Sequence, residues 1–311
     1  MDLSKIIIVP KLTHYEWDMQ RLNLTHKEII QKYRRDGIDV DRIMESHCRQ
    51  KDSLDELKQY FNEKQFISRD NLAKEISKDA ELIISSGGDN HFQYVAHFVN
   101  NKPIIGLNSD PHTSTGVLTY YTTKNFEKSR EKWKNKELSI FDENILKRIK
   151  KDEINIEEWT LLEGILNGKK IQPTMTEYVI GEKEAHRDMT RYILDFDRKK
   201  EEQKSSGLII STGAGSTGYY NSVYKFKHKR RDVFPKTEKI AKFITIMPYE
   251  ELRGNYSILE GVLREGDEMI IHSLSKHEGK IYCDILEDYN FNGGAKFIVR
   301  ISQKSLKVLG K

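Results

Sequence analysis

The stretch at residues 82–92, which reads Leu-Ile-Ile-Ser-Ser-Gly-Gly-Asp-Asn-His-Phe, constrains the fold more than any other part of the chain. An apolar run of strand length ends at small residues and two glycines, and Phe92, Val95 and Val99 then recur at helical spacing. The pattern predicts a buried strand, a tight turn and a helix. Adjacent glycines let a backbone approach a ligand closely, and the N–H groups that open a helix suit a phosphate. An ordinary turn with Asp89 as a capping residue explains these residues equally well.

The first part of the chain predicts an open α/β sheet. Apolar runs at 5–9, 82–85 and 103–108 predict strands, and helical patterns separate the first two. A strand, a helix and a strand in this order imply a right-handed parallel crossover. A further short helix is expected at 71–76. The segment 124–151 is rich in lysine and glutamate with one apolar stripe, which predicts a surface helix that joins two domains.

Beyond residue 155 the periodicity changes to short β-type runs separated by turn residues. These runs lie at 159–162, 177–180, 190–194, 207–210, 239–247, 268–272, 280–285 and 296–301. They predict an all-β C-terminal domain. The expected division is therefore an α/β domain at 1–152, which carries the Gly-Gly-Asp stretch, and a β-rich domain at 153–311. This prediction also allows the last strands to return to the N-terminal domain.

Composition restricts the class of protein. The 311 residues are 37% hydrophobic and 32% charged, and 52 basic residues face 48 acidic ones for a net charge of +4. This balance gives no argument for nucleic-acid binding. No apolar run approaches the roughly 20 residues of a membrane-spanning helix. The two cysteines argue against a disulfide framework, and an apolar run at 6–9 leaves no room for a leader, so we expect a cytoplasmic protein.

A second glycine-rich loop follows the apolar run at 208–210 and reads Ser-Thr-Gly-Ala-Gly-Ser-Thr-Gly-Tyr-Tyr at 211–220. It offers many backbone N–H donors and several hydroxyls within a short arc, which suits a polyphosphate or a ribose. It is not a Walker A loop, because no Gly-Lys-Ser/Thr ends it. A tight turn in a β domain would also carry glycines. The residues predicted to bind phosphate in the two loops are Gly87, Gly213, Gly215 and Ser216.

The order and spacing of these motifs resemble those of the NAD kinase family. The motifs are Gly-Gly-Asp at 87–89, Gly-Leu-Asn at 106–108, Thr-Glu at 176–177 and the loop at 211–219. Residues 11–16, 108–111 and 203–207 are closest to the mitochondrial-type NAD kinases and their bacterial relatives. The resemblance implies an α/β domain and a β domain with the active site between them. It also implies transfer of a phosphoryl group from ATP, with Mg²⁺, to the adenosine-ribose 2′-hydroxyl of NAD, by a homodimer or higher homo-oligomer.

In the resemblance, Asp89 takes the place of the catalytic carboxylate, where it would accept the hydroxyl proton and orient the oxygen toward the γ-phosphorus. No residues are predicted as metal ligands. The residues expected to contact NAD are Gly88, Asn90, Thr176, Glu177, Arg187, Lys204, Thr217, Gly218, Tyr219 and Ser222.

The chain departs from the family pattern at three places. The family reads Gly-Gly-Asp-Gly-Thr, whereas here Asn90 and His91 follow the aspartate. Threonine replaces the asparagine of the family at 176, and Asp284 is followed by Ile-Leu where many members carry Gly-Gln. Two other functions stay open: a non-catalytic NAD- or NADP-binding relative, and a kinase of a different hydroxyl substrate. The intact Asp89 favours catalysis.

Overall fold

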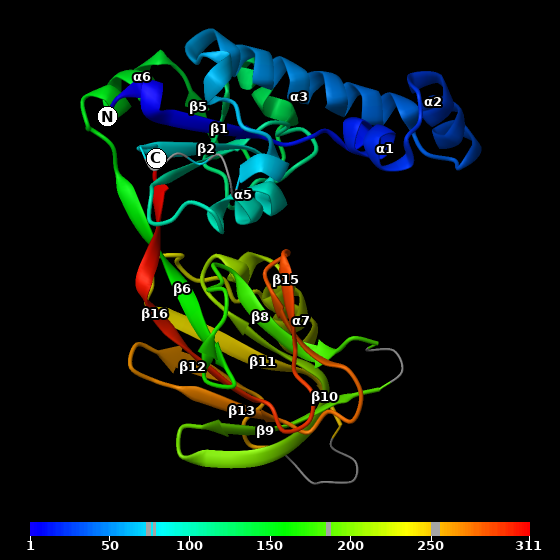
Figure 1. Cartoon of the computed structure of the whole chain (residues 1–311), viewed down its shortest axis with the longest axis vertical. Coiled ribbons are helices and arrows are strands. Elements are labelled where there is room, and N and C mark those ends of the chain that lie inside the picture. The colour runs from blue at the N-terminus through cyan, green and yellow to red at the C-terminus, as the bar shows by residue number, and fades with distance from the viewer. Residues whose placement is uncertain (73–75, 77–78, 185–187, 250–255) are drawn as a thin grey trace. The chain divides into compact units, whose positions relative to one another are not determined.

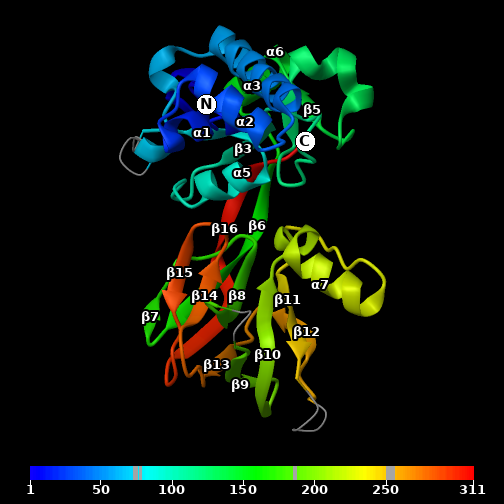
Figure 2. The same ribbon diagram turned by 90° about the vertical axis from the view of Figure 1, so that its right-hand side faces the viewer.

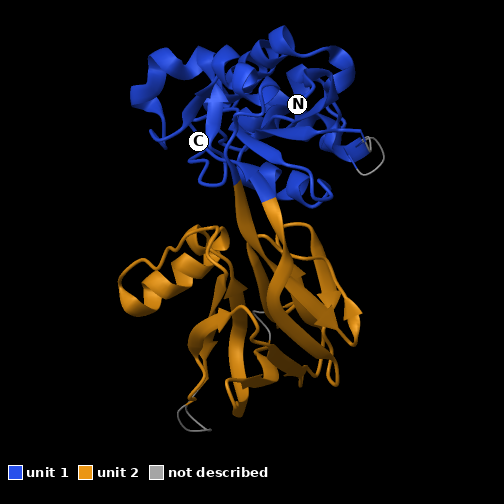
Figure 3. Cartoon of the chain, turned by 90° about the vertical axis from the view of Figure 1, so that its left-hand side faces the viewer, with its two compact units in different colours: residues 1–156, 307–311 blue, residues 157–306 orange. Residues whose placement is uncertain are grey.

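The computed structural model describes residues 1–72, 76, 79–184, 188–249 and 256–311. They form two compact units (Figure 3). Unit 1 comprises Met1–Ile156 and Lys307–Lys311, and unit 2 comprises Glu157–Leu306. The first unit thus runs a few residues past the boundary expected at 152, and the end of the last strand joins it.

Unit 1 is built on a parallel sheet. Its strands are β1 (Ile6–Pro10), β2 (Leu82–Gly87), β3 (Ile104–Asn108), β4 (Tyr121–Thr123) and β5 (Ser139–Phe141). They pair in parallel in the order β1-β2-β3-β4-β5, and Val308 near the end of β16 (Lys296–Leu309) pairs with Ile104 beside them. β1, β2 and β3 are apolar and buried on both faces, as strands covered by helices must be.

Helices cover both faces of this sheet. They are α1 (His14–Leu22), α2 (His26–Arg35), α3 (Val40–Tyr60), α5 (Asp89–Ala96) and α6 (Glu143–Lys150). Short 3₁₀ segments lie at Leu3–Lys5, Glu63–Gln65, Arg69–Asn71 and Lys124–Lys132. α3 and α6 lie on the opposite side of β1 and β2 from α5 (Figure 1). Leu57 of α3 and Ile149 of α6 pack with Ile8 and Ile84 in one core cluster. Most of the short helix expected at 71–76 falls outside the described residues.

The single helix expected at 124–151 is wrong. The segment contains a 3₁₀ stretch, β5 and α6 in succession. Ile140 belongs to β5, while the rest of the apolar stripe belongs to α6, which begins after Asp142 accepts the N–H groups of Asn144 and Ile145. Trp133 is buried, so this segment is part of the unit and not only a solvated connector.

Unit 2 is a large antiparallel sheet. It contains β6 (Ile156–Leu166), β7 (Lys169–Lys170), β8 (Glu177–Glu182), β9 (Thr190–Phe196), β10 (Lys199–Ser211), β11 (Ile240–Pro248), β12 (Glu260–Arg264), β13 (Met269–Ser273), β14 (Gly279–Cys283), β15 (Glu287–Asn290) and most of β16. Each of the eight predicted β-type runs overlaps one of these strands, whereas β7, β12 and β15 lie outside the predicted runs. β10 is the centre, because its first half pairs with β9 and its second half with β8 and β11.

Unit 2 is not purely β, since it also contains α7 (Tyr219–His228) and a 3₁₀ turn at Gly215–Thr217. Figure 2 shows α7 beside β11. Tyr220, Val223 and Tyr224 recur at helical spacing and pack on Ile209 and Ile244 of the sheet. α7 begins at Tyr219, at the end of the second glycine-rich loop.

Candidate active site

The Gly-Gly-Asp stretch has the predicted strand, turn and helix. β2 ends at Gly87, Gly88 is the N-cap of α5 with a φ of −97°, and Asp89 is the first helical residue. A Cβ on Gly88 would lie 3.0 Å from Ser114 Oγ, so the turn runs close to the loop that follows β3. Asp89 thus stands at the carboxyl end of a buried strand and at a helix N-terminus.

The carboxylate of Asp89 is oriented by two backbone donors. The N–H of Val117 donates to Oδ2 at 3.0 Å, and the N–H of Leu118 donates to Oδ1 at 2.8 Å. A carboxylate oxygen can accept more than one hydrogen bond, so these two bonds are compatible with a ligand hydroxyl. This aspartate is held by tertiary contacts and is not merely a helix cap.

The two residues after Asp89 are accommodated by the helix. Asn90 is exposed and lies inside α5, and it is not among the residues with positive φ. His91 is buried, and its Nε2 lies 2.8 Å from the carbonyl oxygen of Val9. Since a carbonyl only accepts, Nε2 carries the proton, and Nδ1 is buried with no hydrogen-bond partner among the described residues. Burial lowers the pKa of His91 to about 4, so the ring is neutral.

In unit 2, the structure brings together the start of β8 and the loop at 211–219. The N–H of Thr212 donates to the carbonyl of Thr176 at 2.8 Å, and the Thr212 hydroxyl donates to the carbonyl of Met175 at 2.6 Å. Thr176 and Glu177 therefore adjoin the predicted phosphate-binding loop.

The glycines of this loop are required by backbone packing. A Cβ on Gly213 would lie 2.1 Å from the carbonyl oxygen of Pro235, and one on Gly215 would lie 2.4 Å from that of Thr176. The hydroxyl of Ser216 donates to the carbonyl of Gly213 at 2.7 Å and accepts the N–H of Phe234. Their binding of phosphate stays a prediction, while their packing role is evident from these contacts.

Asp284, directly after β14, organises the turn that precedes β8. The hydroxyls of Thr174 and Thr176 donate to its Oδ1, and the N–H groups of Met175, Thr176 and Glu177 donate to the same carboxylate at 3.1–3.3 Å. The Thr176 hydroxyl is therefore hydrogen-bonded to Asp284 within unit 2. The sequence singled out Asp284 only for the residues that follow it, and its bonding role was missed.

Glu177 has the opposite environment. Its Oε2 is buried with no hydrogen-bond partner among the described residues. Burial, and next the negative charge of Asp284, raises the pKa of Glu177 to about 7, although the N–H of Tyr220 and the hydroxyl of Ser211 oppose the shift. A carboxyl group of this kind is partly protonated near neutral pH and can donate a hydrogen bond.

Known proteins resemble this chain over most of its length. No protein-family profile matches. The human mitochondrial NAD kinase 2 is 24% identical over 319 residues, which cover 91% of this chain and 70% of that protein. The NAD kinase of Prosthecochloris aestuarii is 23% identical over 280 residues, 89% of this chain and 88% of that protein. The chain is a relative of the NAD kinases.

The fold of an NAD kinase is also confirmed by a solved structure. The crystal structure of the NAD kinase from Archaeoglobus fulgidus in complex with ATP superimposes with a TM-score of 0.61 and 16% identity, over 98% of this chain and 93% of that one. The resemblance noted in the sequence is therefore confirmed, as is the α/β plus β architecture. No helix in the described part of the chain is long and apolar enough to span a membrane.

Four further residues that were predicted to contact NAD lie at the end of the glycine-rich loop and in the first turn of α7. Gly218 is the N-cap of α7, Tyr219 is 46% exposed, and the Ser222 hydroxyl donates to the carbonyl of Gly218 at 3.2 Å. The Thr217 hydroxyl donates to the carbonyl of Ala214 at 3.4 Å, which keeps it with the loop.

One predicted basic contact, Lys204, is not brought to this loop. Lys204 lies seven residues before Ser211 on β10, which is about 23 Å along the strand, and its ammonium lies 4.6 Å from the ring centroid of Tyr249. Arg187 and its neighbour His186 lie outside the described residues.

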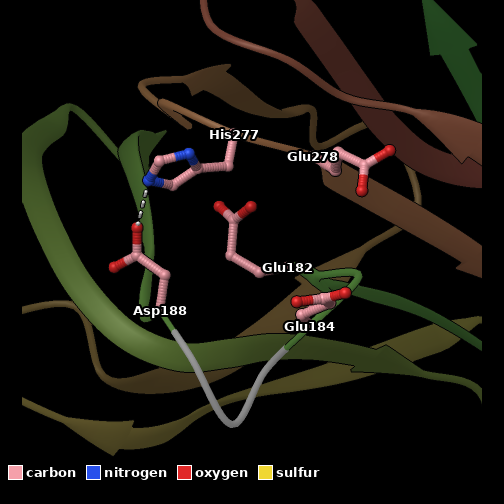
Figure 4. Close-up of a pocket in the computed structure, with 5 residues that line it drawn as sticks. All are labelled: Glu182, Glu184, Asp188, His277 and Glu278. Carbon is pink, nitrogen blue, oxygen red and sulfur yellow. Dashed lines mark ion pairs between the residues drawn. The ribbon is translucent and has the colours of Figure 1, made fainter.

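An acidic pocket occupies the other end of β8. It has a volume of about 470 Å³ and is lined by Glu182, Glu184, Asp188, His277 and Glu278 (Figure 4). Lys183 pairs with Glu278 at 3.1 Å, and the ring of His277 lies 3.3 Å from the carboxylate of Asp188. The described lining is mostly acidic, which disfavours the phosphate groups of a nucleotide.

Proposed function

We propose that this protein transfers the γ-phosphoryl group of ATP to the adenosine-ribose 2′-hydroxyl of NAD, which gives NADP and ADP. The observation that carries the proposal is the carboxylate of Asp89, fixed by two backbone N–H groups at the carboxyl end of β2, in a chain related to NAD kinases. Phosphoryl transfer needs mainly positioning and charge neutralisation, which an oriented carboxylate and phosphate-binding loops can supply.

In this proposal Asp89 accepts the proton of the 2′-hydroxyl as the oxygen bonds to the γ-phosphorus and ADP leaves. The start of β8 and the loop at 211–219 hold NAD, with Glu177 as the group able to donate or accept a hydrogen bond near neutral pH. The proposed NAD contacts also include Asn90, Thr217, Gly218, Tyr219, Ser222, Lys204 and Arg187.

We also propose that Mg²⁺ arrives bound to ATP. The described residues contain no cluster of three or more histidine, cysteine or carboxylate side chains that could hold a metal. Mg²⁺ is commonly bound through substrate phosphates with one or two carboxylates, so a cage of protein ligands is not needed. A homodimer in the cytoplasm completes the proposal; both cysteines are free thiols, which fits a reducing compartment.

The test replaces Asp89 with asparagine and follows NADP with an NADP-specific dehydrogenase. We expect turnover to fall by about 10²- to 10⁴-fold, the usual contribution of a general base, while NAD binding by calorimetry is kept. Asp55→Asn, which removes an exposed carboxylate on α3, is the matched control and should leave turnover unchanged. Normal turnover in Asp89→Asn would refute the role of Asp89.

A second candidate function is a non-catalytic NAD- or NADP-binding relative. The observation in its favour is that Asp284 engages the Thr176 hydroxyl, where the family has an amide. Binding of NAD without any NADP formation by the wild-type protein would support this second function. Phosphorylation of another hydroxyl compound but not of NAD would support a kinase with a different substrate.

A further inference from the structure

Asp110, which follows β3, accepts hydrogen bonds from a helix that is distant in the sequence. The guanidinium of Arg49 on α3 donates to Oδ1 through Nε at 2.9 Å and to Oδ2 through Nη2 at 3.4 Å. The hydroxyl of Ser46, one turn earlier on α3, donates to Oδ2 at 2.7 Å. The side chain of Asp110 is only 4% exposed and that of Arg49 20%, so water screens this ion pair weakly.

Asp110 is the second residue of the loop at 109–118, which carries the two donors to Asp89. Its Oδ2 accepts the hydroxyl of Thr113 at 2.7 Å, and its carbonyl accepts the N–H of Ser114 at 3.0 Å. The amide of Asn108 spans the same turn, because Oδ1 accepts the N–H of Asp110 and Nδ2 donates to the carbonyl of Ser114.

Gly116 closes the path from this turn to the catalytic carboxylate. It has a φ of +62°, and a Cβ there would lie 2.4 Å from both Asn108 Nδ2 and Thr119 Oγ1. The next two residues, Val117 and Leu118, aim their N–H groups at Asp89. An unbroken series of hydrogen bonds and short chain segments therefore links Arg49 to Asp89 within unit 1.

We propose that Arg49, Ser46 and Asp110 form a clamp that positions Asp89 for phosphoryl transfer without touching the substrate. The proposal rests on the function proposed above. The bidentate guanidinium fixes the loop at 109–118, the loop fixes two N–H groups, and these fix the direction of the carboxylate. Arg49 and Asp110 are thus positioning residues whose loss lowers turnover more than substrate affinity.

The magnitude follows from the sensitivity of catalysis to geometry. A displacement of about 1 Å by a change far from the reacting atoms can cost about 100-fold in rate. Other bonds to the loop, from Lys134 N–H to the carbonyl of Pro111 and from Asn135 to that of Gly116, limit the displacement. We therefore expect Arg49→Met and Asp110→Asn to lower kcat by about 10- to 100-fold with KM for NAD and ATP changed less than about 2-fold.

The experiment combines steady-state kinetics with amide hydrogen exchange of the full chain. Arg49→Met and Asp110→Asn should speed the exchange of the Val117 and Leu118 amides by at least about 10-fold relative to wild type, since their hold on the loop is released. Arg49→Lys, which keeps the charge but not the bidentate geometry, should recover part of kcat. Lys58→Ala removes an exposed ion pair on the same helix and is the matched control, with no change expected in either measurement.

The two readouts separate this inference from the proposed function. If the wild-type protein makes no NADP, the proposed function fails, and the exchange rates still decide whether the clamp holds the loop. If the wild type is active, unchanged kcat or unchanged exchange in Arg49→Met overturns the clamp, as does an equal effect of Lys58→Ala. Should Arg49→Met fail to fold, Arg49→Lys decides by the same criteria: its exchange and kcat must lie between those of wild type and Asp110→Asn.

Discussion

Replacing Glu177 with glutamine should change how the stability of unit 2 depends on pH. Glu177 has an Oε2 that is buried without a hydrogen-bond partner among the described residues, and its pKa is raised from 4.5 to about 7 by burial and by Asp284. Glutamine has nearly the same shape but does not titrate. The substitution therefore removes the cost of ionising this buried group while keeping its volume.

The sign and size of the effect follow from linkage. Between pH 4.5 and about 7 the folded chain retains a proton on Glu177 that the unfolded chain has released. Stability therefore falls as the pH rises through this window, and the stabilising contribution of the group is complete only below pH 4.5. A shift of about 2.5 units corresponds to about 3 kcal/mol at 1.36 kcal/mol per unit, as an upper bound.

The assay is urea unfolding at several pH values from 4.5 to 8, followed by a signal from unit 2. We expect the stability of Glu177→Gln relative to wild type to increase as the pH rises, because only the wild type must ionise a buried carboxyl group. The difference in the free energy of unfolding between the two proteins should change by up to about 3 kcal/mol across this pH range. A parallel pH dependence for wild type and Glu177→Gln would refute the buried, proton-retaining carboxyl group.

Two further stability predictions follow from buried residues near the glycine-rich loops. Burial lowers the pKa of His91 from 6.5 to about 4, so unit 1 should lose up to about 3 kcal/mol of stability as the pH falls through this window. His91→Gln, which can still donate a hydrogen bond to the carbonyl of Val9, should abolish that loss in urea unfolding. The same loss of stability at acid pH in His91→Gln would contradict this prediction. Gly215→Ala places a Cβ 2.4 Å from the carbonyl oxygen of Thr176 and should lower stability by about 1–3 kcal/mol in thermal unfolding. Gly181→Ala, whose Cβ would lie 3.7 Å from the carbonyl oxygen of Ser206, should be tolerated. Equal melting temperatures of the two variants would contradict this packing.

The elements that the sequence predicted correctly have strong local signals. β2 and α5 follow from an apolar run, two glycines and a 3.6-residue repeat, all within a dozen positions. α1 was missed because its signal is a capping box, in which Thr13 and Glu16 bond reciprocally, and not a long apolar stripe. In 124–151, Ile140 is out of phase with Ile145, Leu146 and Ile149 at the roughly 100° per residue of a helix, and it pairs as a strand residue with Thr122.

The candidate site shows a similar limit. Asp89 could be predicted because a carboxylate after two glycines is visible in the sequence. Its partners are backbone N–H groups at 117 and 118, which any residue except proline could supply. The contacts of Asp110 with Arg49 and of Asp284 with Thr174 join positions about 60 and 110 residues apart. No local pattern marks such pairs, so their roles required the structure.

Three carboxyl groups near the glycine-rich segments illustrate why residue type alone does not assign a role. Asp89 accepts a backbone N–H on both carboxylate oxygens at the start of a helix, while Asp284 accepts donors from the whole 174–177 turn. Glu177 lacks a partner on Oε2 and holds a proton near neutral pH. Carboxyl groups whose surroundings differ in this way take different parts in acid–base chemistry. The arrangement favours Asp89 as the group that accepts a proton and Glu177 as the group that offers a hydrogen bond to a ligand.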